Sequence, residues 1–150
     1  PMKHILITIW LCLAICLPTW SQEDLRISAA FDKKFTRREG AKEVLVKNLP
    51  VDNKKMTLFH SLALPLSAEE SLEIEQLVLT DEQQALDKER GSKSGRLYYA
   101  FFRLPDKKKN IHRYIFYRND ALRKGANPIT TIIYIEGSVT MTDLRKQFSK

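Results

Sequence analysis

Hydrophobic residues recur with helical spacing in three parts of the chain. In residues 23–39 they return at every fourth position, with acidic residues before the stripe, basic residues after it and a glycine as a stop, which predicts an amphipathic helix. Residues 67–70 have the Ser-x-x-Glu spacing of a capping box and predict a helical segment that ends at residues 91–95. Thr140 with Asp143 predicts a last short helix.

Runs of β-branched and aromatic residues predict strands in much of the remaining chain. They lie at residues 43–47, 96–104, 111–118 and 129–136, and we also interpret residues 56–64 as a strand. The run 96–104 is apolar on both faces, which is typical of a central strand covered on both sides. The pattern as a whole predicts an α+β fold. In it, an antiparallel sheet of about four strands is packed by an N-terminal helix, a middle helical segment and a short C-terminal helix.

The first 21 residues have the composition of a secretory signal peptide. Lys3 and His4 precede an apolar run over residues 5–17, and Thr19 and Ser21 fit the small-residue positions before a cleavage site. The run is shorter than the roughly 20 apolar residues that a membrane-spanning helix needs. We therefore predict cleavage after Ser21, with residues 1–21 as the leader and residues 22–150 as a single domain in the periplasm or outside the cell.

The predicted mature protein has no cysteine, so we expect neither a disulfide nor thiol chemistry in it. Both cysteines and both tryptophans lie in the leader, at Trp10, Cys12, Cys16 and Trp20. Cys16 follows Ile15, which is too bulky for the position before a lipidated cysteine, so we do not expect a lipoprotein. No transmembrane segment is expected after cleavage.

Charge is distributed unevenly along the chain. The whole chain has 25 Lys and Arg against 18 Asp and Glu, whereas residues 67–89 contain eight acidic residues and one basic residue. A basic surface of this kind attracts acidic partners such as an anionic polymer. The candidate residues for such binding are Lys107, Lys108 and Lys109 in a predicted hairpin loop at residues 105–110, and Lys33, Lys34, Arg37 and Arg38 at the end of the first predicted helix.

Catalytic and metal-binding patterns are not found. His60 and His112 are the two histidines outside the leader, and neither has a partner at metal-ligand spacing. The acidic pairs at residues 69–70 and 81–82 are interpreted as complements of a helix dipole. Tyr99-Ala100-Phe101 is similar to the core of an RNA-recognition strand but lacks the preceding glycine and the last aromatic residue. We therefore expect no catalytic residue, metal, cofactor or nucleic-acid partner.

Several short segments resemble a family of small exported proteins of Gram-negative gut anaerobes. They are residues 31–35, 40–46, 96–99, 114–118, 133–137 and 140–144. The family is a domain of unknown function. The resemblance implies export and a small α+β domain, and it supplies no functional positions.

Three functional hypotheses follow. The first is an exported, non-catalytic domain that binds another protein of the cell envelope or assembles with itself. The second is a polyanion-binding module that uses the basic residues named above. The third is a hydrolase whose site is assembled only by the fold.

Overall fold

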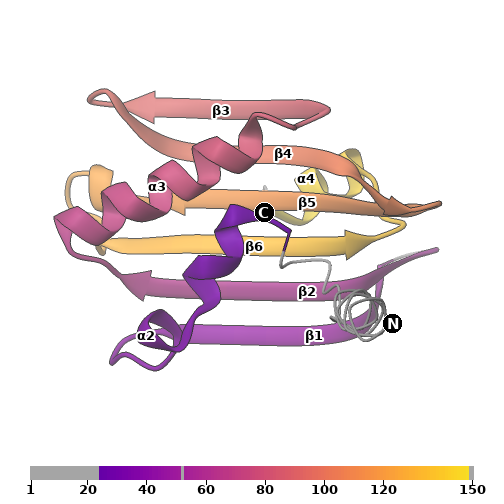
Figure 1. Cartoon of the computed structure of the whole chain (residues 1–150), viewed down its shortest axis with the longest axis horizontal. Helices are drawn as coiled ribbons and strands as arrows, with labels where there is room; N and C mark the ends of the chain where they lie inside the picture. Colours follow the sequence, from indigo (N-terminus) through magenta and orange to yellow (C-terminus); the bar gives the residue numbers. More distant parts are fainter. Residues whose placement is uncertain (1–23, 52, 149–150) are drawn as a thin grey trace, which may run out of the picture.

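A computed structural model describes residues 24–51 and 53–148 and places six strands in one antiparallel sheet. The elements are, in chain order, η1 (Arg26–Phe31), α2 (Lys33–Thr36), β1 (Lys42–Val51), β2 (Lys54–Pro65), α3 (Ala68–Glu82), β3 (Asp87–Lys93), β4 (Arg96–Lys108), β5 (Ile111–Asn119), η2 (Asp120–Leu122), β6 (Ile129–Gly137) and α4 (Met141–Phe148). The strands lie in the order β1-β2-β6-β5-β4-β3 (Figure 1). The predicted leader and its cleavage site lie outside the described residues.

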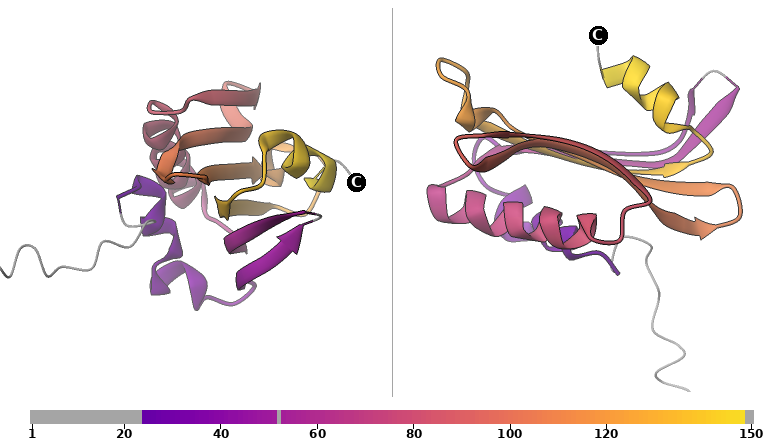
Figure 2. Two further views of the ribbon diagram at one scale, coloured as in Figure 1. Left: turned by 90° about the vertical axis from the view of Figure 1, so that its right-hand side faces the viewer. Right: turned by 90° about the horizontal axis from the view of Figure 1, so that it is seen from above.

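The two faces of the sheet are covered unequally. The helix α3 and the η1–α2 segment lie across one face, which we call the helical face (Figures 1 and 2). The main core forms there, with side chains such as Phe102, Ile115 and Tyr134 fully buried. On the opposite face, α4 packs against one end of the sheet, over a smaller cluster that includes Ile135 and Leu144. We call this the open face.

The predicted four-strand architecture is wrong, because the structure has six strands and is mostly sheet. Strand accounts for 49% of the structure and helix for 28%. The predicted middle helical segment was too long: α3 ends at Glu82, and β3 follows as an edge strand. Its sequence, DKERGSK, contains no large hydrophobic side chain, because an edge strand with exposed and half-buried positions does not need one. Its pattern therefore gave no strand signal.

The predicted N-terminal helix is also wrong in kind. The segment forms a 3-10 helix, η1, followed by an extended Asp32 with ψ 156° and the four-residue α2. Asp81 of α3 holds the start of this segment, since its carboxylate accepts hydrogen bonds from the backbone N–H groups of Arg26 (2.8 Å) and Ile27 (2.7 Å). A tertiary contact thus replaces the helical hydrogen bonds that the periodicity predicted.

The strand and capping predictions are confirmed, with shifted ends. The strand predicted at residues 43–47 is part of the longer strand β1, and the strand predicted at residues 56–64 lies within β2. The predicted hairpin loop at residues 105–110 is mostly strand, because β4 extends to Lys108. The capping box of α3 is present in both directions, and Thr140 and Asp143 exchange the same pair of hydrogen bonds at α4. Among the described residues, no helix has both the length and the apolar composition needed to cross a bilayer.

An acid-sensitive contact ties α3 to the α2 segment. Arg38 donates two hydrogen bonds to the Glu70 carboxylate, at 2.6 and 2.5 Å, and Glu70 also accepts from the backbone N–H of Ser67. The Arg38 guanidinium, followed by the Ser67 N–H group, lowers the pKa of Glu70 from 4.5 to about 2. Because the folded-state pKa is lowered, this stabilisation is present above pH 4.5 and is lost as the pH falls toward 2.

A Glu70→Gln variant is therefore expected to show a smaller loss of stability on acidification than the unmodified protein. The free energy of unfolding, measured by urea denaturation between pH 6 and about pH 2.5, checks this expectation. Glu69→Gln is a matched control, because Glu69 is exposed and adjacent in sequence. Parallel pH profiles for the Glu70→Gln variant and the unmodified protein would contradict the assignment.

Candidate binding groove

The open face of the sheet carries a band of aromatic side chains. Side chains alternate between the two faces along a strand. In β4, Ala100, Phe102 and Leu104 therefore enter the main core, whereas Tyr99 and Phe101 lie on the open face. The strand predicted to be covered on both sides is in fact next to the edge strand β3, and on its open face Phe101 packs in the cluster that includes Leu144 of α4.

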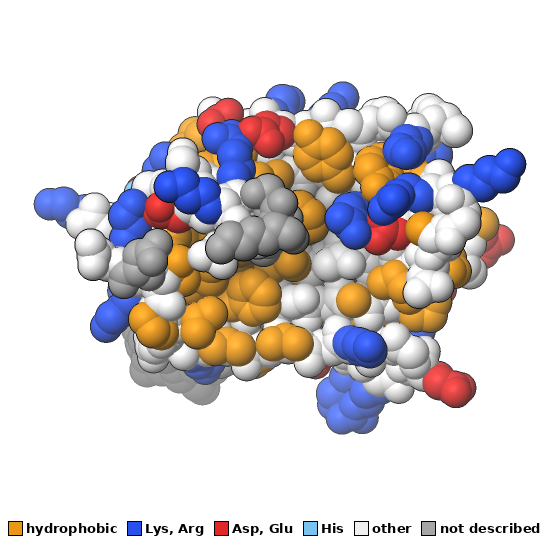
Figure 3. Space-filling model, turned by 180° about the vertical axis from the view of Figure 1, so that it is seen from behind, with side chains coloured by type: hydrophobic (Ala, Val, Ile, Leu, Met, Phe, Trp, Pro, Cys, Tyr) orange, Lys and Arg blue, Asp and Glu red, His pale blue; other side chains and the backbone are white. Residues whose placement is uncertain are grey.

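A groove of about 440 Å³ lies on this face beside α4. Its volume is within the usual range of small-molecule pockets. It is lined by Glu89 of β3, Tyr99 and Phe101 of β4, Phe116 of β5, and Thr142, Arg145 and Lys146 of α4. Figure 3 shows this side of the molecule, where hydrophobic surface is bordered by Lys and Arg side chains.

Cross-strand contacts position the aromatic floor of the groove. The rings of Phe101 and Phe116 meet edge to face, with 6.3 Å between their centroids, in register with the β4–β5 pairing. Phe101 also contacts Tyr114, whose hydroxyl donates to the Val139 carbonyl at 2.7 Å. Such aromatic pairs hold their rings in defined orientations. The strand pairing and these ring contacts therefore fix the positions of the aromatic side chains that form the floor of the groove.

Gly91 sets the position of the Tyr99 ring. The two residues are paired across β3 and β4, and the ring lies over the glycine. A Cβ atom on Gly91 would be 2.8 Å from Tyr99 Cε1, closer than side-chain contacts allow. The glycine therefore lets the tyrosine lie flat against the edge strand, where it forms one wall of the groove.

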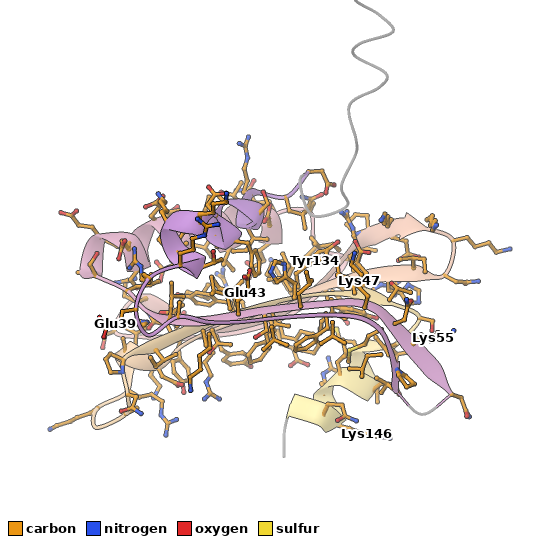
Figure 4. All side chains as sticks on the ribbon, turned by 90° about the horizontal axis from the view of Figure 1, so that it is seen from below. Glu39, Glu43, Lys47, Lys55, Tyr134 and Lys146 are labelled. Atoms are coloured by element: carbon orange, nitrogen blue, oxygen red, sulfur yellow. The ribbon has the colours of Figure 1, made fainter. Side chains whose placement is uncertain are left out.

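The rim of the groove is charged. Arg145 of α4 forms an ion pair with Glu89 of β3, and the two side chains are 44% and 40% exposed. Lys146 is exposed on the same helix and lies on the open side of the sheet (Figure 4). The rim therefore has two cationic groups and one carboxylate, and its ion pair is accessible to solvent.

The predicted polyanion-binding residues do not form one surface. Lys33, Lys34, Arg37 and Arg38 lie at the α2 end of the sheet, and Lys107, Lys108 and Lys109 lie at the β4–β5 hairpin at the other end (Figure 1). Several also have acidic partners within the chain. Arg38 binds Glu70, Lys34 lies 3.4 Å from Glu73, and Lys107 lies 3.8 Å from the buried Glu136.

The acidic segment at residues 67–89 has a structural role that its sequence did not reveal. Glu75 binds Arg96, Glu82 binds Arg90, and Asp81 binds the backbone of η1. Asp81 and Glu82 lie at the C-terminal end of α3, so the prediction that this pair complements a helix start is wrong. Glu69 and Glu70 do lie in the first turn, as expected.

The two histidines lie in polar contacts on opposite faces of the sheet. His60 Nε2 is 2.8 Å from Glu43 Oε2, and its ring stacks on Phe31 with 3.9 Å between centroids. His112 Nδ1 is 2.9 Å from Asp106 Oδ1 and 3.1 Å from Arg103 Nη2. In the part of the chain that the structure describes, no three His, Cys, Asp or Glu residues are grouped as metal ligands.

Comparison with known proteins identifies a family to which the chain is similar. The model of a family of unknown function, DUF6108, matches residues 14–148. Neither the curated proteins nor the solved structures with which the chain was compared give a significant match.

Proposed function

The chain belongs to DUF6108, a family of unknown function, and we propose that it is an exported, non-catalytic module that binds a segment of another protein in the groove. The aromatic floor with a cationic rim is the observation that carries this proposal. The leader-like composition of residues 1–21 supports export, and a partner in the cell envelope follows from that location.

The lining favours a segment that presents an apolar or aromatic side chain next to a carboxylate. Tyr99 and Phe116 are half-buried and offer ring faces and edges above the buried Phe101, and aromatic residues of this kind are common anchors at protein interfaces. Arg145 offers a guanidinium whose present partner, Glu89, is exposed and so can be exchanged for a ligand carboxylate. Exchange of one carboxylate for another keeps the arginine paired in the bound state.

The distribution of charge favours this proposal over polyanion binding. A polymer needs an uninterrupted basic track, whereas the basic residues of this chain are divided between opposite ends of the sheet and are partly paired with α3 carboxylates. The groove instead combines apolar area with a small number of charges, as protein interfaces do at their centres.

Peptide selection tests the proposal with a defined probe. A library of random 12-residue peptides is selected against the purified protein, and the enriched peptides are measured by titration calorimetry. We expect enriched peptides to pair an aromatic or large aliphatic residue with Asp or Glu, and we expect Tyr99→Ala and Phe116→Ala each to weaken binding about tenfold or more.

Tyr98→Ala is the matched control, because Tyr98 is the neighbouring tyrosine and does not line the groove. Its affinity for the same peptides is expected to stay within about twofold of the unmodified protein. Enriched peptides that bind the Tyr99→Ala and Phe116→Ala variants as tightly as the unmodified protein would place the binding surface elsewhere. Circular dichroism of each variant separates lost binding from lost folding.

A further inference from the structure

The two edges of the sheet differ in how they are protected. The edge strand β3 is seven residues long, is rich in charged residues and has a register irregularity between Gly91 and Ser92. These are the features by which proteins prevent an edge from pairing with another strand. The other edge, β1, is ten residues long and has an uncharged run at Val44, Leu45 and Val46.

Exposed hydrophobic side chains are concentrated on β1. The described part of the chain has five large hydrophobic residues classed as exposed, and three of them are Val44 (46%), Leu45 (56%) and Leu49 (38%). Val44 and Leu45 occupy consecutive positions, so one of them lies on each face of the sheet. An edge that is apolar on both faces is suited to continue the sheet into another strand.

From this edge we infer that β1 pairs antiparallel with β1 of a second copy of the chain, centred on Leu45, to form a twelve-stranded sheet. This inference is independent of the groove, which is lined by β3, β4, β5 and α4 and so lies toward the opposite edge of the sheet. The extended part of β1 suited to pairing ends at Asn48, whose φ of 58° interrupts the strand conformation.

The sequence of β1 is complementary to itself in this register. Antiparallel pairing about a two-fold axis places Leu45 opposite Leu45 of the partner subunit and Val44 opposite Val46 of the partner subunit. It also places Glu43 opposite Lys47 of the partner subunit, twice by symmetry. Opposed residues point to the same face. Two opposite-charge pairs, each formed between the two copies, therefore lie on either side of the central leucine contact.

The neighbouring registers lose this match. Because side chains alternate along the strand, a slip by one residue would turn the helical face of one copy to the other side of the joined sheet. The neighbouring registers that keep both helical faces on one side therefore differ by a slip of two residues. One shift places Glu43 opposite Leu45 of the partner subunit, and the other places Leu45 opposite Lys47 of the partner subunit. Only the register centred on Leu45 opposes like with like among apolar residues and acid with base among charged ones.

The surroundings of β1 leave the charged groups available. Figure 4 shows Glu43 and Lys47 on the helical side of the sheet along the outer strand. Glu43 is bound to His60 through Oε2, and its side chain remains 37% exposed. Lys47 is exposed, and no ion pair to it occurs among the described residues. The adjoining ends of β1 and β2 bend toward the side of α4, away from α2 (Figure 2).

Charge-reversal variants test the register directly by sedimentation velocity on protein produced from the full chain. The unmodified protein is expected to dimerise, and Lys47→Glu and Glu43→Lys are each expected to raise the dimer dissociation constant about tenfold or more. Each variant alone opposes like charges across the pair. A one-to-one mixture of the two variants opposes only unlike charges, so it is expected to recover the dimer.

Lys124→Glu is the charge-matched control, because Lys124 is exposed in the loop after η2 and lies outside β1. It is expected to leave the dimer unchanged. A protein that is monomeric at concentrations on the order of 0.1 mM would overturn the inference. A dimer that both reversals leave intact, or a mixture that stays monomeric although both variants fold, would overturn it as well.

A crosslink keeps the test decisive if Glu43→Lys disturbs the contact with His60. In a background with Cys12 and Cys16 replaced by serine, L45C places two thiols directly opposite each other, at a Cβ separation of about 4.5 Å that a small adjustment brings into the range of a disulfide. Mild oxidation is expected to give a disulfide-linked dimer from L45C and not from L49C. Equal crosslinking of both variants, or of neither, would contradict the register.

Discussion

Gly137→Ala is expected to lower the free energy of unfolding by about 3 kcal/mol, because a side chain at this position has no space. A Cβ atom there would lie 2.1 Å from the backbone oxygen of Lys55 and 2.9 Å from Met56 Cα. Both neighbours are main chain in β2, so neither can rotate away. The glycine lies where β6 pairs with β2 next to a register shift between Met56 and Leu58, and it is the last residue of β6 before the short connection to α4.

Guanidinium denaturation of Gly137→Ala and Gly95→Ala separates the steric effect from the general cost of replacing a glycine. Gly95 has a positive φ of 74° and no atom within 4 Å of the added Cβ, so its replacement is expected to cost only about 1 kcal/mol. Similar losses for the two variants would show that β2 and β6 do not approach as closely as the structure indicates.

Glu75→Ala is expected to lower the free energy of unfolding by a similar amount, about 3 kcal/mol. Glu75 is buried, and its Oε1 accepts hydrogen bonds from Arg96 Nε at 3.0 Å and from the backbone N–H of Leu97 at 2.8 Å. Truncation removes both acceptor contacts and leaves a partly buried guanidinium and a buried N–H group without them. These contacts fasten α3 to the first residues of β4, so the helical layer depends on them.

Glu73→Ala is the matched control for this prediction. Glu73 is two residues away on the same helix and forms an ion pair with Lys34 in which the side chains are 59% and 50% exposed. Exposed pairs of this kind contribute less than about 1 kcal/mol. Urea denaturation is expected to show a small change for Glu73→Ala and a large one for Glu75→Ala. Equal changes would contradict the structural role assigned to the buried carboxylate.

The elements that the sequence predicted well are those whose signals are local. The capping residues of α3 and α4 and the hydrophobic runs of β4, β5 and β6 depend on near neighbours, and each is present in the structure. The N-terminal segment was predicted wrongly because its backbone N–H groups bind Asp81, 54 and 55 positions away. β3 was missed because an exposed edge strand needs no hydrophobic pattern.

The candidate groove could be predicted only in part. The aromatic residues of 96–104 and 114–117 stood out in the sequence, and alternation along a strand divides them between two faces. Which face stays open depends on where α3 and α4 pack, and no local pattern specifies this packing. The pairing of Glu89 with Arg145 likewise joins an edge strand to the last helix and has no sequence signature.

Crosslinking in producing cells tests the proposed function most directly. A photoreactive amino acid is placed at position 142, where Thr142 lines the groove, and for comparison at position 80, where Thr80 is exposed on α3. We expect position 142 to capture one protein species that persists in high salt and is lost when Tyr99 and Phe116 are both replaced by alanine. Capture that does not depend on the groove, or recovery of only an anionic polymer that high salt removes, would contradict the proposal.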